Sequence, residues 1–317
     1  MLRLGFFTYL GGFRDAIDVM NETIELFRAA EDLGYDSVWV AQHHFGPVVG
    51  TLPSPLPFLA HVAARTTRVR LGTAVVILPT ENPVRLAEDA AVVDLLSGGR
   101  LELGVGSGTD PAVFAALGYD AARRRELMSG HLDTLLALLA GKELPTKHIL
   151  YPLAPGLSTR VWQGVFTPER AVQAARAGTH LLLPKASANH PDLTAERQAE
   201  AAAAFREAWP TGRIALSRPV YVSSSRAAAV EELATELAFQ VTLVNRQPGA
   251  SSTITVEDYV DSGVFHLGSP EDVAASLRAD AALAHADELI IQVGHYGPGR
   301  ANTLRCLELF RELATTL

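Results

Sequence analysis

Short apolar runs alternate with amphipathic or alanine-rich stretches from one end of the chain to the other. Apolar runs of this kind, separated by segments with helical periodicity, are typical of parallel strands joined by crossover helices. Eight repeats of strand and helix predict a TIM (β/α)8 barrel, an α/β fold. We expect its strands at residues 2–8, 37–41, 69–75, 101–105, 160–164, 180–183, 214–222 and 288–293.

Two of the intervening segments carry clear helix signals. NETIELFRAAEDLG, residues 21–34, places apolar side chains at helical spacing and ends at Gly34, a residue suited to a helix C-terminus. In ENPVRLAEDAAVVDLLSGG, residues 81–99, Pro83 can occupy the first helical turn and the two final glycines end the helix. Both segments favour crossover helices that pack against the sheet.

An open, doubly wound sheet is the alternative α/β architecture. It would place a G-x-G-x-x-G fingerprint after its first strand, but Gly11 and Gly12 follow that strand without this spacing. GVGSG at 104–108 follows the fourth strand and has no third glycine at the required offset. We therefore favour the barrel and expect residues 1–317 to form a single domain.

Two connections are longer than a simple repeat needs. Residues 148–160 are rich in proline and glycine, and residues 245–263 are polar. Long inserted loops in a barrel enzyme often form lids or walls of the active site. A disordered tip is the alternative for both, and the two possibilities are balanced for 245–255.

Composition narrows the class of ligand. The net charge of -8 and the scattered basic residues give no patch for nucleic acid or an anionic membrane surface, so we expect a small-molecule substrate. No apolar run reaches the roughly 18–20 residues that would span a bilayer. The single cysteine, Cys306, cannot form an internal disulfide and fits a reducing compartment. We expect a cytoplasmic protein that uses no metal.

The most distinctive chemistry lies in WVAQHHF, residues 39–45, where a strand ends. Alternation along the strand places Trp39 and His43 on one face and His44 on the other, so only one histidine should face the barrel mouth. In a TIM barrel the active site lies at the carboxyl ends of the strands, and an imidazole can move protons at neutral pH. A histidine that bonds a neighbouring carbonyl group is the structural alternative.

Small residues cluster at the end of the third strand. Gly72, Thr73 and Ala74 stand beside Val75, and together they could form a flat apolar wall suited to a planar ring. The alternative is that small residues are needed there only to fit the barrel interior.

Four strings in this chain resemble the bacterial luciferase-like, flavin-dependent monooxygenases and oxidoreductases. Their order and spacing extend the resemblance over nearly the whole chain. An FMN-dependent, luciferase-like subgroup also shares LPSPLPFLAHVAART and LYPLAPGL. The four strings are GFFTYL, WVAQHHF, LGTAVVILPTENPVRLAEDAAVVDLLSGGRLELGVGSG and ELIIQVGHYGPGRANTLRCLELFRELA.

The resemblance implies a luciferase-like barrel that binds reduced FMN at its mouth and uses oxygen to act on a small organic substrate. It also implies a separate flavin reductase as a partner and a homodimer formed through the helix around Glu88 and Asp89. An F420-dependent hydride-transfer enzyme on the same barrel is one alternative. A flavin-binding protein without catalysis is another.

The resemblance also assigns roles to residues near the flavin ring. His43 matches the acid/base histidine, although Gln42 stands where many members carry glutamate. Ala74 and Val75 should meet the face of the flavin and be joined by a cis peptide bond.

The flavin phosphate has two candidate sites. Gly106, Ser107, Gly108 and the neighbouring Thr109 should pass close to the ribityl chain or the phosphate, although luciferases carry arginine in place of Ser107. The second site follows the fifth strand, where Thr167 can cap a helix whose free N–H groups bind anions and Arg170 can add charge-assisted contacts. Ordinary helix capping without a ligand is the alternative there.

Overall fold

The computed structural model describes residues 2–12, 14–46, 51–187, 193–246, 252–293 and 297–317. Eight parallel strands follow one another around a closed barrel, and the pairing of the last strand with β8 completes the circle. All eight predicted strands are confirmed, with ends that differ by at most two residues. In the order of their pairing they are β10 (Glu288–Gln292), β1 (Arg3–Thr8), β2 (Ser37–Val40), β3 (Arg70–Thr73), β5 (Leu101–Gly106), β6 (Val161–Gly164), β7 (His180–Leu183) and β8 (Ile214–Val222).

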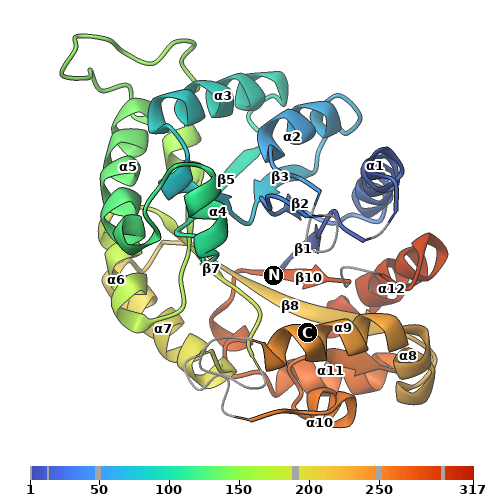
Figure 1. Ribbon diagram of the computed structural model, residues 1–317. Coiled ribbons are helices and arrows are strands. Elements are labelled where there is room, and N and C mark those ends of the chain that lie inside the picture. The colour runs from blue at the N-terminus through green and yellow to red at the C-terminus, as the bar shows by residue number, and fades with distance from the viewer. Residues whose placement is uncertain (1, 13, 47–50, 188–192, 247–251, 294–296) are drawn as a thin grey trace.

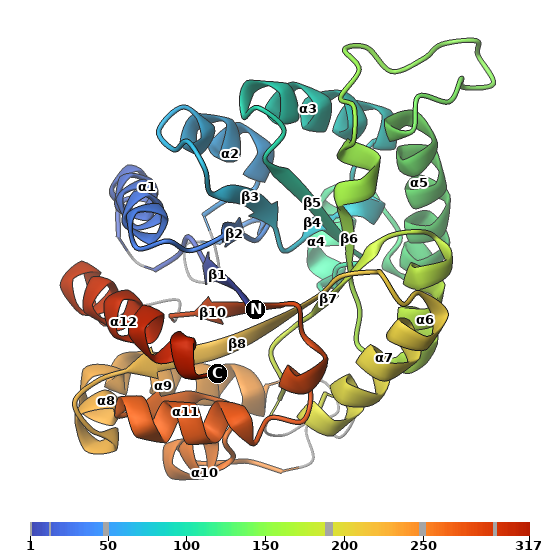
Figure 2. The ribbon, with the colours of Figure 1, turned by 180° about the vertical axis from the view of Figure 1, so that it is seen from behind.

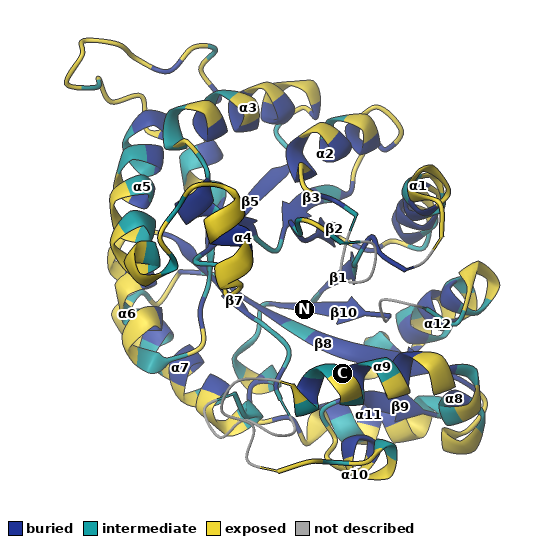
Figure 3. Cartoon of the chain, in the orientation of Figure 1, coloured by how far each residue is buried: buried dark blue, intermediate teal, exposed yellow. Residues whose placement is uncertain are grey.

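Helices surround the strands on the outside (Figures 1 and 2). Their inward faces are buried and their outward faces exposed (Figure 3), as an amphipathic pattern requires. The helices are α1 (Ala16–Asp32), α2 (Pro55–Ala63), α3 (Pro83–Leu96), α4 (Pro111–Ala116), α5 (Arg124–Leu139), α6 (Pro168–Arg176), α7 (Ala195–Ala208), α8 (Arg226–Glu232), α9 (Ala234–Asn245), α10 (Val256–Asp261), α11 (Pro270–Arg278) and α12 (Arg300–Leu313).

Two short strands were not predicted from the sequence. β4 (Val76–Ile77) pairs with β5 and extends the wall of the barrel beyond the end of β3. β9 (His266–Gly268) pairs with the long strand β8. Neither is long enough to show an alternating pattern in the sequence.

The barrel interior is filled by two tryptophans. The rings of Trp39 and Trp162 meet edge to face, with their centroids 5.8 Å apart. A Cβ atom on Gly72 would lie 2.0 Å from the ring of Trp39, so glycine is required there to admit the indole. The structural explanation for the small residue is therefore correct at Gly72.

A buried carboxylate lies beside these tryptophans, near the amino ends of the strands. Glu102 is 1% exposed and accepts hydrogen bonds from Trp162 Nε1 at 2.6 Å and from Arg213 Nη2 at 2.7 Å. Arg70 Nε donates to its other oxygen. Two cations and an indole thus surround one buried anion at the end of the barrel away from the strand tips.

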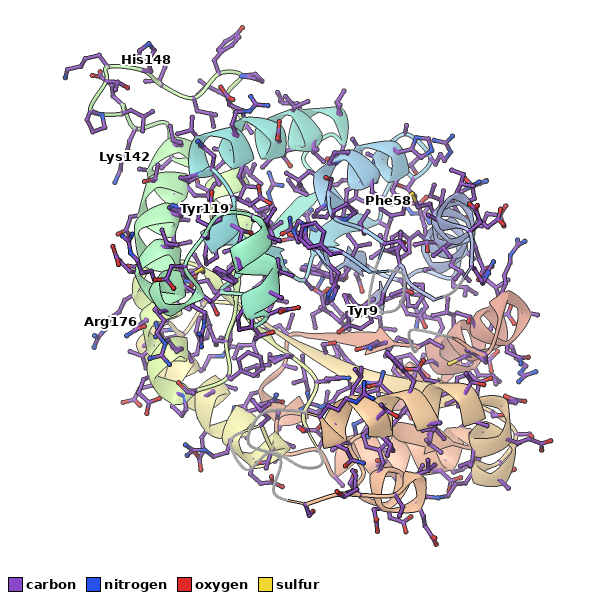
Figure 4. The ribbon with its side chains drawn as sticks, in the orientation of Figure 1. Tyr9, Phe58, Tyr119, Lys142, His148 and Arg176 are labelled. Atoms are coloured by element: carbon purple, nitrogen blue, oxygen red, sulfur yellow. The ribbon has the colours of Figure 1, made fainter. Side chains whose placement is uncertain are left out.

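The loop that follows α5 projects away from the barrel, and Figure 4 labels Lys142 and His148 on it. Ile149, Tyr151 and Leu153 on this loop are exposed, Tyr151 at 82%, whereas Leu150 and Ala154 are buried. The prediction that residues 148–160 form a lid or a site wall is wrong, because none of them lines the cavity described below. Residues 247–251 of the second long connection lie outside the described residues, and α10 occupies part of the remainder.

No helix in the described part of the chain combines the length and the apolar character needed to cross a bilayer.

Candidate functional site at the barrel mouth

A cavity of about 350 Å³ opens at the carboxyl ends of the strands. This volume falls within the range of about 300–1,000 Å³ that is typical of small-molecule sites. Every one of the eight barrel strands contributes to its lining, either directly or through the residues that follow it. The cavity is therefore in the place where TIM-barrel enzymes carry their active sites.

Part of the lining consists of small residues that lie at the ends of β5 and β6 or just after β3. Ala74, Val75, Gly106 and Gly164 all lie in this part. A Cβ atom on Gly106 would lie 2.5 Å from Val75 Cγ2, and one on Gly164 would lie 3.2 Å from Val75 Cγ1. The Ala74–Val75 peptide bond is cis, as predicted. We call these four residues the small-residue wall; their flat surface fits a planar ring.

Both histidines of the WVAQHHF segment line the cavity. The prediction that only one of them faces the mouth is wrong, because β2 ends at Val40 and its alternation does not continue through the following residues. The backbone N–H of His43 donates to the carbonyl of Leu52 at 3.0 Å, and the His43 ring lies 5.5 Å from the ring of Tyr9. The catalytic candidate is therefore held at the mouth by backbone pairing.

His44 is a site residue that the sequence did not single out. Burial lowers the pKa of its imidazole, and the nearby Glu81 only partly opposes this effect. Its Nε2 atom is buried and has no hydrogen-bond partner among the described residues. A buried polar atom of this kind normally has a partner, so its position in the cavity wall indicates a place for a ligand or a water molecule.

Gln42 holds the segment in place. Its side-chain oxygen accepts from the backbone N–H of Ile77 at 2.6 Å, and its Nε2 donates to the carbonyl of Pro53 at 3.0 Å and to Glu81 Oε1 at 2.7 Å. A glutamate could accept from Ile77 but could not donate to the other two groups. The glutamine therefore connects the end of β2 to β4 and to the loop before α2.

The part of the lining that comes from β7, β8, β10 and β1 and the residues that follow them combines apolar side chains such as Phe7 and Ile290 with four polar ones. We call Lys185, Ser217, Gln292 and Tyr9 the polar half. Figure 4 labels Tyr9, which extends from the end of β1. Loss of hydration together with the negative charge of Glu236 raises the pKa of Tyr9 to about 12, so its hydroxyl keeps its proton at neutral pH.

The predicted phosphate contacts lie in two different environments. Ser107, Gly108 and Thr109 line the cavity together with Gly106. Thr167 caps α6 as predicted, accepting from the backbone N–H of Arg170 at 3.4 Å, while Arg170 Nη1 donates to Gln173 Oε1 at 3.1 Å.

Neither Thr167 nor Arg170 lines the cavity, although their neighbour Phe166 does. Their role as phosphate contacts stays a prediction.

Among the described residues, no group of three His, Cys, Asp or Glu side chains is placed to hold a metal ion. Cys306 is buried, as expected for a core residue, and burial raises the pKa of its thiol to about 12.

Comparison with known proteins identifies the family. The 4-hydroxyprotoasukamycin monooxygenase of Streptomyces nodosus subsp. asukaensis is 42% identical over 124 residues, which are 39% of this chain and 33% of that protein. The chain spans between about a third and about half of the length of the first curated relatives that it matches.

Two solved structures show the same fold. The oxygenating constituent of 3,6-diketocamphane monooxygenase from Pseudomonas putida, in complex with FMN, has a TM-score of 0.78 at 17% identity over 98% of this chain and 97% of that one. An F420-dependent secondary alcohol dehydrogenase in complex with an F420-acetone adduct has a TM-score of 0.72 at 17% identity over 98% of each chain. The model of the luciferase-like monooxygenase family matches residues 6–288, and the chain therefore belongs to that family.

Proposed function

We propose that the protein is an FMN-dependent, oxygen-using monooxygenase that acts on a small organic substrate. The observation that carries this proposal is the small-residue wall at the barrel mouth. Gly106 and Gly164 leave space there that a larger side chain would fill, and two histidines line the same cavity. Ala74 and Val75 would hold the ring, and Gly106, Ser107 and Gly108 would follow its ribityl chain. Reduced FMN supplies the electrons that activate oxygen when it is bound.

His43 is the proton-transfer residue in this proposal. A ring nitrogen of its imidazole would give a proton to, or take one from, the reacting groups in the cavity. Apolar side chains such as Phe7 and Ile290 also line the cavity and help to exclude water.

The proposal includes two partners. A separate reductase would supply reduced flavin. A second copy of the chain would pack on α3, where Arg85 holds Asp89 at 3.1 Å and also bonds Glu88. Beyond these charges α3 exposes Val92, Leu95 and Leu96, at 43%, 48% and 68%. Apolar side chains exposed together in this way are typical of an interface.

The cofactor assignment is tested by anaerobic titration with photoreduced FMN and, separately, with reduced F420. We expect FMN to bind and F420 to bind more weakly. Oxygen is then admitted with a panel of aldehydes, ketones and aromatic compounds, and oxygen consumption and oxygenated product are measured. F420 binding with oxygen-independent hydride transfer would favour the dehydrogenase alternative. FMN binding without any turnover would favour a flavin-binding protein without catalysis. Binding of neither cofactor would contradict the proposed function and both alternatives.

The small-residue wall gives a further prediction. Gly106→Ala should weaken FMN binding by about tenfold or more, equivalent to about 1.4 kcal/mol, because the added methyl group displaces Val75 into the space of the ring. Fluorescence quenching of FMN measures the affinity.

Gly130→Ala is the matched control, since Gly130 is exposed in α5 and a Cβ atom there meets nothing within 4 Å. The control should keep full affinity and gain about 0.5–1 kcal/mol in helix stability. Unchanged FMN affinity in Gly106→Ala would contradict the placement of the ring at this wall.

A further inference from the structure

The polar half of the cavity contains one cationic side chain, Lys185, among the described residues of the lining. It follows β7 directly after Pro184. The carbonyl group of Pro184 accepts from Gln198 Nε2 at 2.8 Å and from Arg218 Nη1 at 3.2 Å. These two bonds fix the backbone from which Lys185 extends, so its position at the mouth is set by the barrel and by α7.

A chain of hydrogen bonds leads from Lys185 away from the cavity. Its ammonium group donates to Gln240 Oε1 at 2.8 Å, and Gln240 Nε2 donates to Glu236 Oε1 at 2.6 Å. Both acceptors belong to α9, are 3% and 1% exposed, and are not part of the cavity lining. The positively charged residue of this chain is therefore the one that lines the cavity, and the negatively charged Glu236 lies behind it in α9.

The charge of Lys185 depends on this arrangement. Loss of hydration lowers the pKa of Lys185, and the carboxylate of Glu236 acts in the opposite direction. Burying a carboxylate such as that of Glu236 costs free energy unless a nearby positive charge and hydrogen bonds compensate it. The charge of Glu236 favours the protonated form of Lys185. The ammonium group has three N–H donors, and Gln240 accepts from one of them.

Other strands add neutral polar side chains to the same cavity. Ser217 lies in β8, beside β7, and Gln292 lies in β10, beside β8. Tyr9 adds a hydroxyl group that keeps its proton. A cation in a cavity that also presents neutral hydrogen-bond donors is suited to an oxygen that carries negative charge, and the one acidic side chain among the described residues of the lining, Asp110, follows β5 on another part of the wall.

We propose that Lys185 binds an anionic oxygen of the substrate, either a carboxylate or an ionised phenol. This inference rests on the proposed function, because that function places the flavin in the same cavity. The small-residue wall then receives the cofactor, and the polar half receives the charged group of the substrate.

Calorimetry with two pairs of probes tests the proposal. Benzoate is compared with benzamide, and 4-nitrophenolate with nitrobenzene, so that each pair differs mainly in charge. We expect the charged member of at least one pair to bind about tenfold or more tightly than its neutral counterpart, a difference of about 1.4 kcal/mol. The pair that shows the preference identifies the carboxylate or the phenolate. Equal binding within both pairs would overturn the proposal.

Variants show whether Lys185 causes the preference for the charged probe. Lys185→Met should abolish it, Lys185→Arg should keep its direction, and Lys142→Met, on the projecting loop, should leave it unchanged. Circular dichroism confirms that each variant is folded. A preference that survives in a folded Lys185→Met would contradict the proposal.

FMN titration separates this inference from the proposed function. If Lys185→Met loses FMN binding but keeps the probe preference, the lysine belongs to the cofactor and the inference is wrong. If the wild type shows a preference that depends on Lys185 but binds no flavin, the proposed function fails and the anion site stands.

Discussion

Replacing His43 with alanine should lower kcat by about 10²- to 10⁴-fold, the usual contribution of a general acid or base. The imidazole lines the cavity and lies 5.5 Å from the ring of Tyr9, and its backbone is held by the bond to Leu52. Removing the side chain takes away the proposed proton-transfer group but leaves the small-residue wall intact. FMN affinity should therefore change by less than about threefold, or under about 0.7 kcal/mol.

His44→Ala is the matched control, because His44 lines the same cavity from the next position in the chain. Burial lowers the pKa of His44, so it is a poorer proton donor at neutral pH. We expect a smaller loss of kcat in this variant. Turnover at saturating reduced FMN measures both effects. A full loss in His44→Ala together with unchanged turnover in His43→Ala would move the catalytic assignment to His44.

Glu102→Gln should destabilise the fold by about 3–5 kcal/mol, the usual cost of breaking a buried ion pair from one side. The amide would leave Arg70 and Arg213 without the anion that both now contact inside the barrel. Chemical denaturation at neutral pH measures the loss. Glu126→Gln is the control: it removes an exposed partner of Arg123 and should leave the midpoint of denaturation nearly unchanged.

The effect of Glu102→Gln should depend on pH. Burial alone would raise the pKa of Glu102, but Arg213 and Arg70 outweigh it, so the pKa is lowered in the folded protein. A depressed folded pKa gives stability that is present above the unfolded value, about 4.3 for glutamate, and is lost as pH falls through the folded pKa. The free energies of unfolding of the wild type and Glu102→Gln should thus differ most at pH 7 and become similar in acid. A difference that stays constant down to the acid transition would contradict the ionic role.

The sequence predicted the barrel well because each long strand and its following helix carry a local signal. His180–Leu183 and Ile214–Val222 have the bounds that their apolar runs indicate. Pro83 begins α3, and Asn82 caps it by accepting from two backbone N–H groups. β4 and β9 were missed because strands of two or three residues depend on their partner and not on their own pattern. The assignment of 1–317 to one domain stays a prediction.

The site was predicted mainly where its residues belong to the strings that carry the family resemblance. Ala74, Val75 and Gly106 line the cavity as expected, while the second histidine was missed because β2 stops before it. The bond from Lys185 to Gln240 joins positions 55 residues apart, and no local pattern could indicate it. Likewise, the capping rule located Thr167 at the start of α6 but could not show where that helix start lies relative to the cavity.

The division of the cavity between two sets of strands has an evolutionary consequence. The small-residue wall lies on or just after β3, β5 and β6, whereas the polar half lies on or just after β7, β8, β10 and β1. If the two sides bind cofactor and substrate as proposed, mutations that recruit a new substrate can accumulate on one arc of the barrel while selection preserves the other. Descendants of one ancestral barrel could diversify in this way without having to evolve cofactor binding again.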